Sequence, residues 1–246
     1  MSNHNCIEDV RNDFLLKYLK REFIKDKTGI NCIELIGMQF IANEDFIFGK
    51  PNEDYIKREL NWYESKSLNV YDIEAPVPEI WTRVCDKDGK INSNYGWCIW
   101  SHENFEQYKS VLLELQNNPH SRRAQMIYTR PSMWRDYNAN GMSDFICTTA
   151  VQYFIRNNKL ISYVTMRSND AFHGYRNDVA WQKYIQSMLA KELNVEAGDM
   201  IWNVGSLHLY ESQFYLVDYF KQTGKTYIKR SEYAKQYEGL VITNYE

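Results

Sequence analysis

The sequence predicts a single α+β domain, because its strand-like segments are clustered and do not alternate regularly with helices. The chain has 246 residues and is 44% hydrophobic, which is enough to bury a sizeable core. Only 11 Gly and 5 Pro occur, so the composition indicates a folded protein without repeats or a disordered linker. We therefore expect one domain over residues 1–246.

Helices are expected where apolar residues recur every three or four positions. The clearest example runs from 105 to 115, where Phe105, Tyr108, Val111 and Leu115 fall at helical spacing. The Asn and Pro residues of 117–123 then end that helix. By the same criterion the other helices are expected at 8–23, 52–66, 181–189 and 211–222.

Strands are expected where β-branched and aromatic residues dominate a short stretch. The segments 145–155 and 159–168 have this composition, and the Asn157-Asn158 pair between them indicates a hairpin. In the stretch 199–210, His208 and Tyr210 alternate with leucines and should share one face of a strand. The remaining strand-like segments are 28–43 and 124–129.

Composition and termini narrow the class of protein. A formal net charge of −3 gives no basic field for non-specific nucleic-acid binding. No apolar run approaches the roughly 18 residues of a membrane span. The stretch MSNHNCIEDV lacks the features of a signal peptide, so we expect a cytoplasmic location. The five cysteines form no CxxC pair, which predicts free thiols and no metal site.

Cys147 has two interpretations. Free cysteine is usually buried, and in a strand over 145–155 its side chain would share a face with Phe145 and Thr149. As a nucleophile it would need positive charge nearby, which favours the thiolate. Arginines that could supply this charge are Arg122, Arg123 and Arg167. Together with Ser168 and with Lys27 of DKTG, these arginines would also suit a phosphate dianion, whose oxygens match such donors.

Other polar residues are ambiguous when taken singly. Glu59 lies in the helical segment 52–66, where an exposed Glu paired one turn away is the ordinary case. Asp178 precedes the helical stripe of 181–189, where Asp is a favoured N-cap. His208 and Tyr210 would ordinarily be a core pair with satisfied polar tips. Only the combination of these residues is specific.

That combination resembles the thymidylate synthase family over nearly the whole chain. The matching stretches, in the family's order and spacing, are DKTG, RELNW, IW, NYGW, NPHSRR, DFICTTAVQYF, MRSND, GYRNDVA and IWNVGSLHLY. The resemblance implies a mixed β-sheet with flanking helices that dimerises through the sheet. It also implies a homodimer whose subunits share their active sites.

The resemblance assigns a role to each candidate residue. Cys147 matches the nucleophile, Glu59 the glutamate that manages protons, and Tyr95 the tyrosine beside the nucleophile. The matched phosphate ligands are Lys27, Arg167 and Ser168 from one subunit, with Arg122 and Arg123 from its partner. The matched contacts to the sugar hydroxyl are His208 and Tyr210, and those of the folate site are Trp81 and Asp170.

Asp178 departs from the family's pattern and changes the expected substrate. Thymidylate synthases have Asn there, which pairs with uracil, and they have Pro and usually His where this chain has Ile146 and Thr148. A carboxylate accepts from the amino group of cytosine, and with one shared proton it also satisfies the ring nitrogen. Facing uracil, it would leave a buried carbonyl unpaired at a cost of about 1–3 kcal/mol, a factor of about 5–150. We therefore expect Asp178 to select cytosine.

The resemblance then implies a hydroxymethyltransferase of this family acting on dCMP. Such an enzyme would transfer a one-carbon unit from 5,10-methylenetetrahydrofolate to carbon 5 and add water, giving 5-hydroxymethyl-dCMP and tetrahydrofolate without a metal. A phage source, the host cytoplasm and association with other enzymes of nucleotide synthesis are implied by the resemblance alone. The alternatives are a thymidylate synthase methylating dUMP, an inactive nucleotide-binding relative, and an unrelated binding module.

Overall fold

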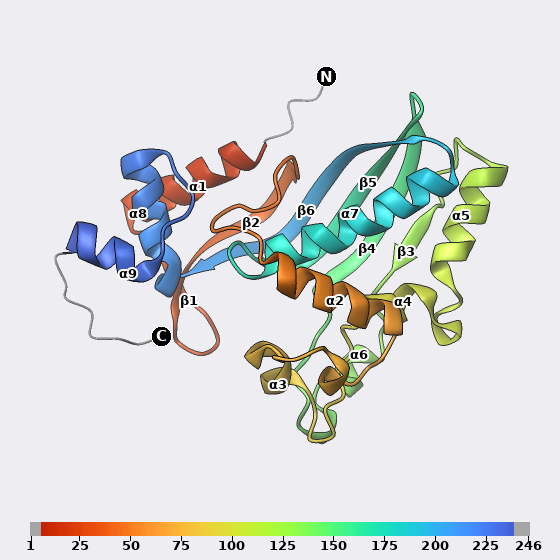
Figure 1. The fold of residues 1–246 in the computed structure, drawn as a ribbon, viewed down its shortest axis with the longest axis horizontal. Helices are drawn as coiled ribbons and strands as arrows, with labels where there is room; N and C mark the ends of the chain where they lie inside the picture. Colours follow the sequence, from red (N-terminus) through yellow and green to blue (C-terminus); the bar gives the residue numbers. More distant parts are fainter. Residues whose placement is uncertain (1–5, 239–246) are drawn as a thin grey trace. The chain divides into compact units, whose positions relative to one another are not determined.

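The computed structural model describes residues 6–238, which contain a six-stranded sheet with flanking helices, so the predicted α+β class is confirmed (Figure 1). The strand order is β1-β2-β6-β5-β4-β3. The strands are β1 (Ile24–Lys25), β2 (Asn31–Ile41), β3 (Gln125–Ile127), β4 (Thr148–Arg156), β5 (Lys159–Asp170) and β6 (Glu196–Tyr210). Neighbouring strands β1/β2, β3/β4 and β4/β5 are antiparallel.

The longer helices agree with those expected from apolar spacing. They are α1 (Ile7–Lys20), α2 (Glu53–Ser65), α5 (Gln107–Asn117), α7 (Gly174–Glu192) and α8 (Phe214–Thr223). Four shorter helices of the described chain were not predicted: α3 (Glu79–Val84), α4 (Tyr95–Trp100), α6 (Met133–Asp136) and α9 (Arg230–Tyr233). Within residues 6–238, no helix is both long enough and apolar enough to cross a bilayer.

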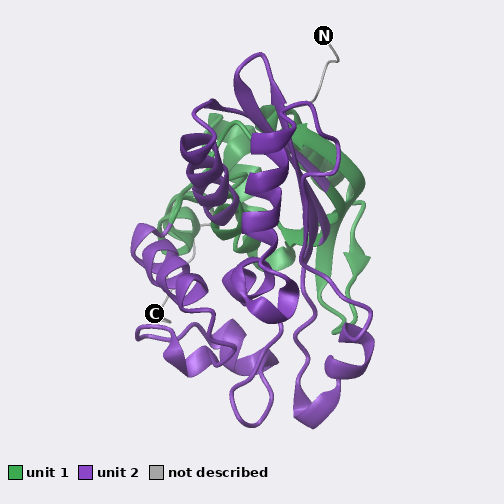
Figure 2. Cartoon of the chain, turned by 90° about the vertical axis from the view of Figure 1, so that its right-hand side faces the viewer, with its two compact units in different colours: residues 1–51, 168–179, 204–246 green, residues 52–167, 180–203 purple. Residues whose placement is uncertain are grey.

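The chain divides into two compact units, which Figure 2 colours separately. Among the described residues, unit 1 comprises residues 6–51, 168–179 and 204–238, and unit 2 comprises residues 52–167 and 180–203. Strands β5 and β6 each contribute residues to both units. The division of β5 falls between Arg167 and Ser168.

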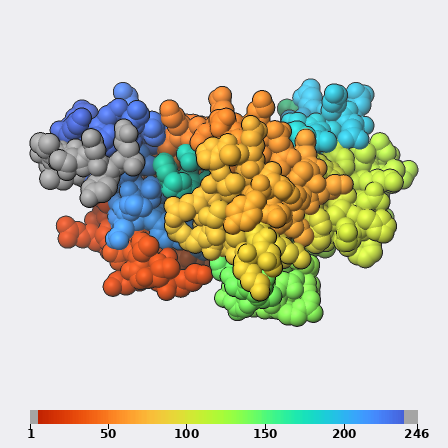
Figure 3. All heavy atoms as spheres, turned by 60° about the horizontal axis from the view of Figure 1, so that its bottom comes forward, coloured from red at the N-terminus to blue at the C-terminus, as the bar shows by residue number. Residues whose placement is uncertain are grey.

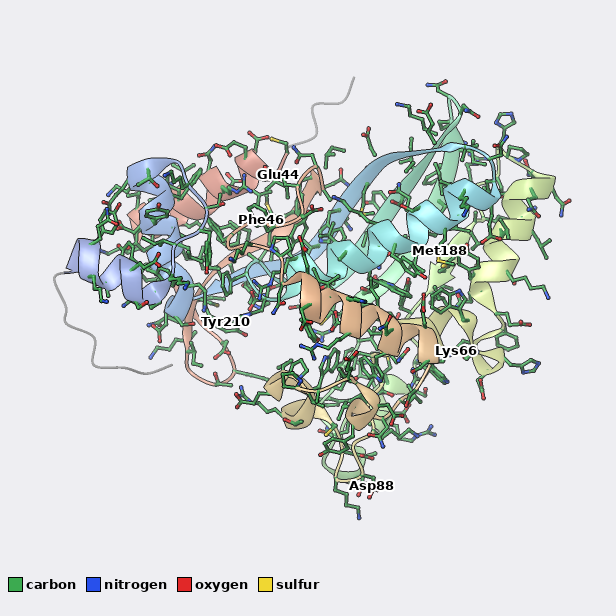
Figure 4. The ribbon with its side chains drawn as sticks, viewed as in Figure 1. Glu44, Phe46, Lys66, Asp88, Met188 and Tyr210 are labelled. Atoms are coloured by element: carbon green, nitrogen blue, oxygen red, sulfur yellow. The ribbon has the colours of Figure 1, made fainter. Side chains whose placement is uncertain are left out.

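In unit 1, helix α1 packs against β2 and α8, and a buried arginine ties it to the chain that follows β2 (Figure 1). Arg11 is 3% exposed. Its guanidinium donates to the Glu44 carboxylate at 2.8 Å, to the Ile47 carbonyl at 2.7 Å and to the Phe46 carbonyl at 3.0 Å. Figure 4 labels Glu44 and Phe46 near the end of α1. Each donor of this buried cation therefore has an acceptor, which burial of a charge requires.

In unit 2, strands β4 and β5 form the predicted hairpin. Asn157 and Asn158 both have positive φ, 52° and 58°, as a two-residue type I′ turn requires. The flanking residues Arg156 and Lys159 pair across the turn. At the other end of β4 the register shifts between Thr148 and Ala150, so the strand begins at Thr148 and not at residue 145. The expectation that Cys147 lies within the strand was therefore wrong.

Helix α4 lies very close to α2, and a glycine makes this possible. A Cβ on Gly96 would be 1.8 Å from the carbonyl oxygen of Tyr63, so any larger residue would collide with backbone. Asn94 caps α4 by accepting from the Trp97 N–H at 2.7 Å. The packing brings the ring of Tyr95 onto that of Tyr63, with centroids 5.3 Å apart and planes 26° from parallel.

Also in unit 2, two surface segments lie side by side, residues 86–90 and 139–141. Asn140 donates to the carboxylates of Asp86 at 3.2 Å and Asp88 at 3.0 Å. Figure 3 shows the corresponding yellow and green surfaces adjoining each other. These contacts hold the chain after α6 against the turn that precedes α4.

Candidate functional site

The sequence-predicted residues are divided between the two units. Unit 2 contains Glu59, Trp81, Tyr95, Arg122, Arg123, Cys147 and Arg167. Unit 1 contains Lys27, Ser168, Asp170, Asp178, His208 and Tyr210.

In unit 2, the Cys147 thiol lies beside a guanidinium. Cys147 is half-buried, unlike the fully buried thiols of Cys32, Cys85 and Cys98, so the interpretation as a buried core residue was wrong. Nη2 of Arg167 lies 3.4 Å from the Cys147 sulfur. A positive charge at this distance favours the thiolate, which is the nucleophilic form of cysteine. Of the three arginines that could supply positive charge to the thiol, Arg167 is the one whose guanidinium lies beside it.

Arg167 is itself held by the segment that carries the thiol. Its Nε donates to the Ile146 carbonyl at 3.0 Å, and Nη2 donates to the Phe145 carbonyl. Its backbone N–H donates to the Cys147 carbonyl at 2.9 Å. The guanidinium also lies over the Phe145 ring, 5.1 Å from the centroid. Side chain and backbone of Arg167 therefore fix the position of the thiol relative to the charge.

A buried carboxylate, which the sequence analysis missed, anchors the start of this segment. Asp144 accepts from the backbone N–H groups of Asn92 and Ser93 at 2.7 and 2.8 Å, and from the Ser93 hydroxyl at 2.7 Å. Burial raises the pKa of Asp144, and these hydrogen bonds and the nearby Arg167 partly offset the rise. Asp144 thereby joins the segment before Cys147 to the residues before Tyr95.

Glu59 is buried on α2 and carries an unusual proton affinity. It is 6% exposed, and burial raises its pKa to about 7, although hydrogen bonds from Tyr55, Trp81 and Tyr63 work in the opposite direction. The interpretation of Glu59 as an exposed helix residue paired with Lys or Arg one turn away was wrong, because Glu59 is buried and its partner one turn away is Tyr55. That role belongs to Asp54, which accepts from Arg58 Nε at 3.0 Å.

Glu59, Tyr55 and Trp81 form a continuous hydrogen-bonded chain. Trp81 Nε1 donates to the Tyr55 hydroxyl at 2.8 Å, and that hydroxyl donates to the Glu59 carboxylate. Burial and the adjacent Glu59 raise the pKa of Tyr55, so its proton is retained. Because a pKa near 7 lets Glu59 both release and accept a proton at neutral pH, this arrangement suits general acid–base chemistry.

The predicted pair Arg122 and Arg123 is exposed in unit 2. Nη2 of Arg123 forms an ion pair with Glu114 at 3.1 Å. The Arg122 carbonyl accepts from Gln152 Nε2 at 2.7 Å, which fixes the backbone and leaves the guanidinium exposed. Their use by a partner subunit stays a prediction.

In unit 1, the aspartate that accepts from backbone N–H groups before α7 is Asp170 and not Asp178. Helix α7 begins at Gly174, so Asp178 lies inside the helix and the N-cap interpretation was wrong. Asp170 instead accepts from the backbone N–H groups of Phe172 at 2.7 Å and His173 at 2.8 Å, immediately before the helix. Oδ2 of Asp178 accepts from Asn169 Nδ2 at 2.7 Å.

His208 and Tyr210 share one face of β6, as predicted, but they are half-buried and not core residues. Their ring centroids are 5.1 Å apart, and Leu209 between them is fully buried on the other face. Burial raises the pKa of Tyr210, with further contributions from Asp26 and Asp170. Figure 4 labels Tyr210 at the end of the strand.

Lys27 is exposed in the turn between β1 and β2 of unit 1. Asp26 Oδ1 fixes this turn by accepting from Thr28 N at 2.8 Å, Thr28 Oγ1 at 2.7 Å and Ile30 N at 3.0 Å. Across residues 6–238, no three His, Cys, Asp or Glu side chains gather as ligands of a metal ion.

Comparison with known proteins identifies the family. The thymidylate synthase family model matches residues 22–238. Deoxycytidylate 5-hydroxymethyltransferase of Enterobacteria phage T4 is 51% identical over 96% of this chain and 99% of its own length, and that of phage T6 is 51% identical over 97% and 100%. Thymidylate synthase of Francisella tularensis subsp. holarctica is 27% identical over 80% of this chain and 78% of its own. The chain belongs to the thymidylate synthase family.

Proposed function

We propose that this protein transfers a one-carbon unit from 5,10-methylenetetrahydrofolate to carbon 5 of dCMP and adds water, giving 5-hydroxymethyl-dCMP. The main support for a cytosine nucleotide as substrate is the Asp178 carboxylate, which accepts a hydrogen bond from Asn169 at 2.7 Å. A carboxylate fixed as an acceptor suits the amino-bearing edge of cytosine and opposes the carbonyl of uracil. The relatives named for this activity support the assignment, since they are similar along almost their whole length.

The nucleophile in this proposal is the Cys147 thiolate, stabilised by Arg167 at 3.4 Å. Its sulfur bonds to carbon 6 of the pyrimidine, and the electron pair of the 5,6 double bond makes carbon 5 nucleophilic. Asp178 assists by placing a proton on the ring nitrogen, which withdraws electrons from carbon 6. At the end of the reaction the bond between sulfur and carbon 6 breaks, and the ring double bond is restored.

Methylenetetrahydrofolate supplies the one-carbon unit in this proposal. Trp81 and Asp170 suit such an amphipathic ligand, because one offers an aromatic face and the other a carboxylate acceptor. Glu59, whose pKa of about 7 lets it exchange protons near neutral pH, orders the attacking water and takes its proton. Carbon 5 bonds to the methylene carbon, carbon 5 then loses its proton, and the bond from the methylene carbon to the folate nitrogen breaks, so that tetrahydrofolate leaves and an exocyclic methylene remains. The water oxygen bonds to this carbon, which becomes the hydroxymethyl group as the sulfur leaves carbon 6.

We assign the phosphate of dCMP to Lys27, Arg167 and Ser168 of one subunit, with Arg122 and Arg123 of its partner. His208 and Tyr210 are assigned to the sugar hydroxyl, and Tyr95 to the surroundings of the nucleophile. The proposal therefore includes a homodimer with shared active sites, and one catalytic domain over residues 1–246. Sedimentation of an active species at monomer mass would contradict the shared sites.

The decisive experiment is mass analysis of the product formed from dCMP and methylenetetrahydrofolate in ¹⁸O-labelled water. The proposal expects a 5-hydroxymethyl product that carries the label, and no dihydrofolate signal in the absorbance of the reaction. Cys147→Ser should abolish turnover while dCMP binding persists. Asp178→Asn should shift the preference from dCMP toward dUMP. Methylation of dUMP with formation of dihydrofolate by the unaltered protein would overturn the proposal in favour of a thymidylate synthase.

A further inference from the structure

Asn169 is a buried amide in unit 1 whose side-chain nitrogen has a hydrogen-bond partner and whose side-chain oxygen has none among residues 6–238. The residue is 3% exposed and lies near the end of β5, between Ser168 and Asp170. Its Nδ2 donates to Oδ2 of Asp178 at 2.7 Å. Its Oδ1 is buried and has no hydrogen-bond partner within the part of the chain that the structure describes. A buried carbonyl oxygen without a donor is costly, so its presence here calls for an explanation.

The orientation of the Asn169 amide follows from the charge beside it. If the amide were turned over, its oxygen would face the Asp178 carboxylate, and two acceptors would oppose each other. The hydrogen bond therefore fixes Nδ2 toward Asp178, and it also fixes Oδ1 as a second acceptor of the pair. One oxygen of the Asp178 carboxylate is engaged by Asn169, which restricts the directions that the other oxygen can take.

Gly174 provides the space for this pair. Its φ lies outside the left-handed region, so backbone conformation does not require glycine there. A Cβ on residue 174 would be 3.0 Å from Asn169 Nδ2 and 3.5 Å from Asp178 Oδ2. The first distance is too short for comfortable contact, and a larger residue would displace the amide. Absence of a side chain at the first residue of α7 therefore maintains the hydrogen bond.

We propose that Asn169 is a specificity-determining residue, which orients the Asp178 carboxylate and offers its own Oδ1 to the second hydrogen of the cytosine amino group. This inference rests on the proposed function. An amino group has two hydrogens to donate, and the Asn169–Asp178 pair presents two fixed acceptors. A uracil carbonyl at the same place would face both acceptors without any donor, so the pair discriminates more strongly than Asp178 alone.

The test compares kcat/KM for dCMP and dUMP in three variants of the full-length protein. Asn169→Leu removes both hydrogen-bonding functions at similar volume. Gly174→Ala keeps Asn169 but presses on its amide. Gln186→Met is the matched control, because Gln186 is 4% exposed and its Nε2 donates to the Leu160 and Gly198 carbonyls at 2.8 and 3.2 Å.

We expect the preference for dCMP over dUMP to fall at least tenfold in Asn169→Leu, and to fall in the same direction in Gly174→Ala. Gln186→Met should lower the melting temperature but leave the preference unchanged. Affinities for both nucleotides, measured by calorimetry without folate, should shift in parallel with the kinetic preference. If Asn169→Leu does not fold, the Gly174→Ala preference decides the question.

Two results would separate failure of this inference from failure of the proposed function. If the unaltered protein prefers dCMP and both site variants keep that preference, Asn169 is not a specificity residue, and the proposed function stands. If the unaltered protein itself prefers dUMP, the proposed function is wrong, and the inference about Asn169 that rests on it is wrong as well. A loss of preference in Gln186→Met equal to that in Asn169→Leu would reduce the effect to general destabilisation and overturn the inference.

Discussion

Replacement of Glu59 by Gln should make the protein more stable than the unaltered form in mildly alkaline solution. Burial raises the pKa of Glu59 from its ordinary value of 4.5 to about 7. An acid whose pKa is raised by folding favours the folded state below the unfolded value, and this advantage is lost as pH rises through the folded value. Glutamine has the same shape, stays neutral and can still accept from the Tyr55 hydroxyl.

The magnitude follows from the size of the pKa shift. Each pKa unit corresponds to about 1.4 kcal/mol, so a shift from 4.5 to about 7 penalises the ionised carboxylate by about 3 kcal/mol. Below pH 4.5 the unaltered protein and Glu59→Gln should unfold with similar free energies. Between that pH and about 7 the two should diverge, and above pH 8 the variant should be more stable by about 3 kcal/mol.

Urea denaturation at fixed protein concentration, from pH 5 to pH 9, measures this difference directly. Glu53→Gln is a suitable control, because Glu53 is an exposed carboxylate at the start of the same helix. The control should follow the unaltered protein at every pH. An equal difference in unfolding free energy between Glu59→Gln and the unaltered protein at pH 5.5 and pH 8.5 would show that burial does not penalise the ionised Glu59 carboxylate.

Three other substitutions test buried contacts within the two units. Gly96→Ala, whose Cβ would be 1.8 Å from the Tyr63 carbonyl, should cost about 3 kcal/mol or more, and an unchanged melting curve would contradict it. Asp144→Ala leaves the buried N–H groups of Asn92 and Ser93 without an acceptor. It should lower the free energy of unfolding in urea by about 2–4 kcal/mol, and kcat should be lower than in the unaltered protein. Arg11→Met removes a buried cation and leaves the Ile47 and Phe46 carbonyls without their donor, which should cost about 3 kcal/mol by the same assay; a loss below about 1 kcal/mol would count against it.

Regular periodicity could be predicted from the sequence, because it is a local property. Two such predictions were correct, since each depends only on neighbouring residues: the shared strand face of His208 and Tyr210, and the turn at Asn157-Asn158. The helices α3, α4 and α6 were missed for the converse reason. They have six, six and four residues, too few for a 3.6-residue period to repeat clearly.

Burial of polar residues could not be predicted, because distant segments produce it. Glu59 was correctly placed on a helix, but glutamate is rarely buried, and its pKa is raised by that burial. No local sequence pattern indicates that Asp144 is buried and hydrogen-bonded, since its donors lie about fifty residues earlier in the chain. The helix start at Gly174 was missed because GYRND has the composition of a turn.

The short motif at the end of β5 contributes one residue to a contact in each unit. Successive residues of a strand point to opposite faces. Within unit 2, Arg167 lies beside the Cys147 thiol, and within unit 1, Asn169 binds the Asp178 carboxylate. Only Ser168 separates these two residues in the sequence, so their spacing along the chain is fixed covalently. An insertion between them would change which face each side chain occupies, whereas most loop insertions are tolerated. The MRSND stretch is therefore constrained by both contacts at once, which accounts for its value as a sequence signal.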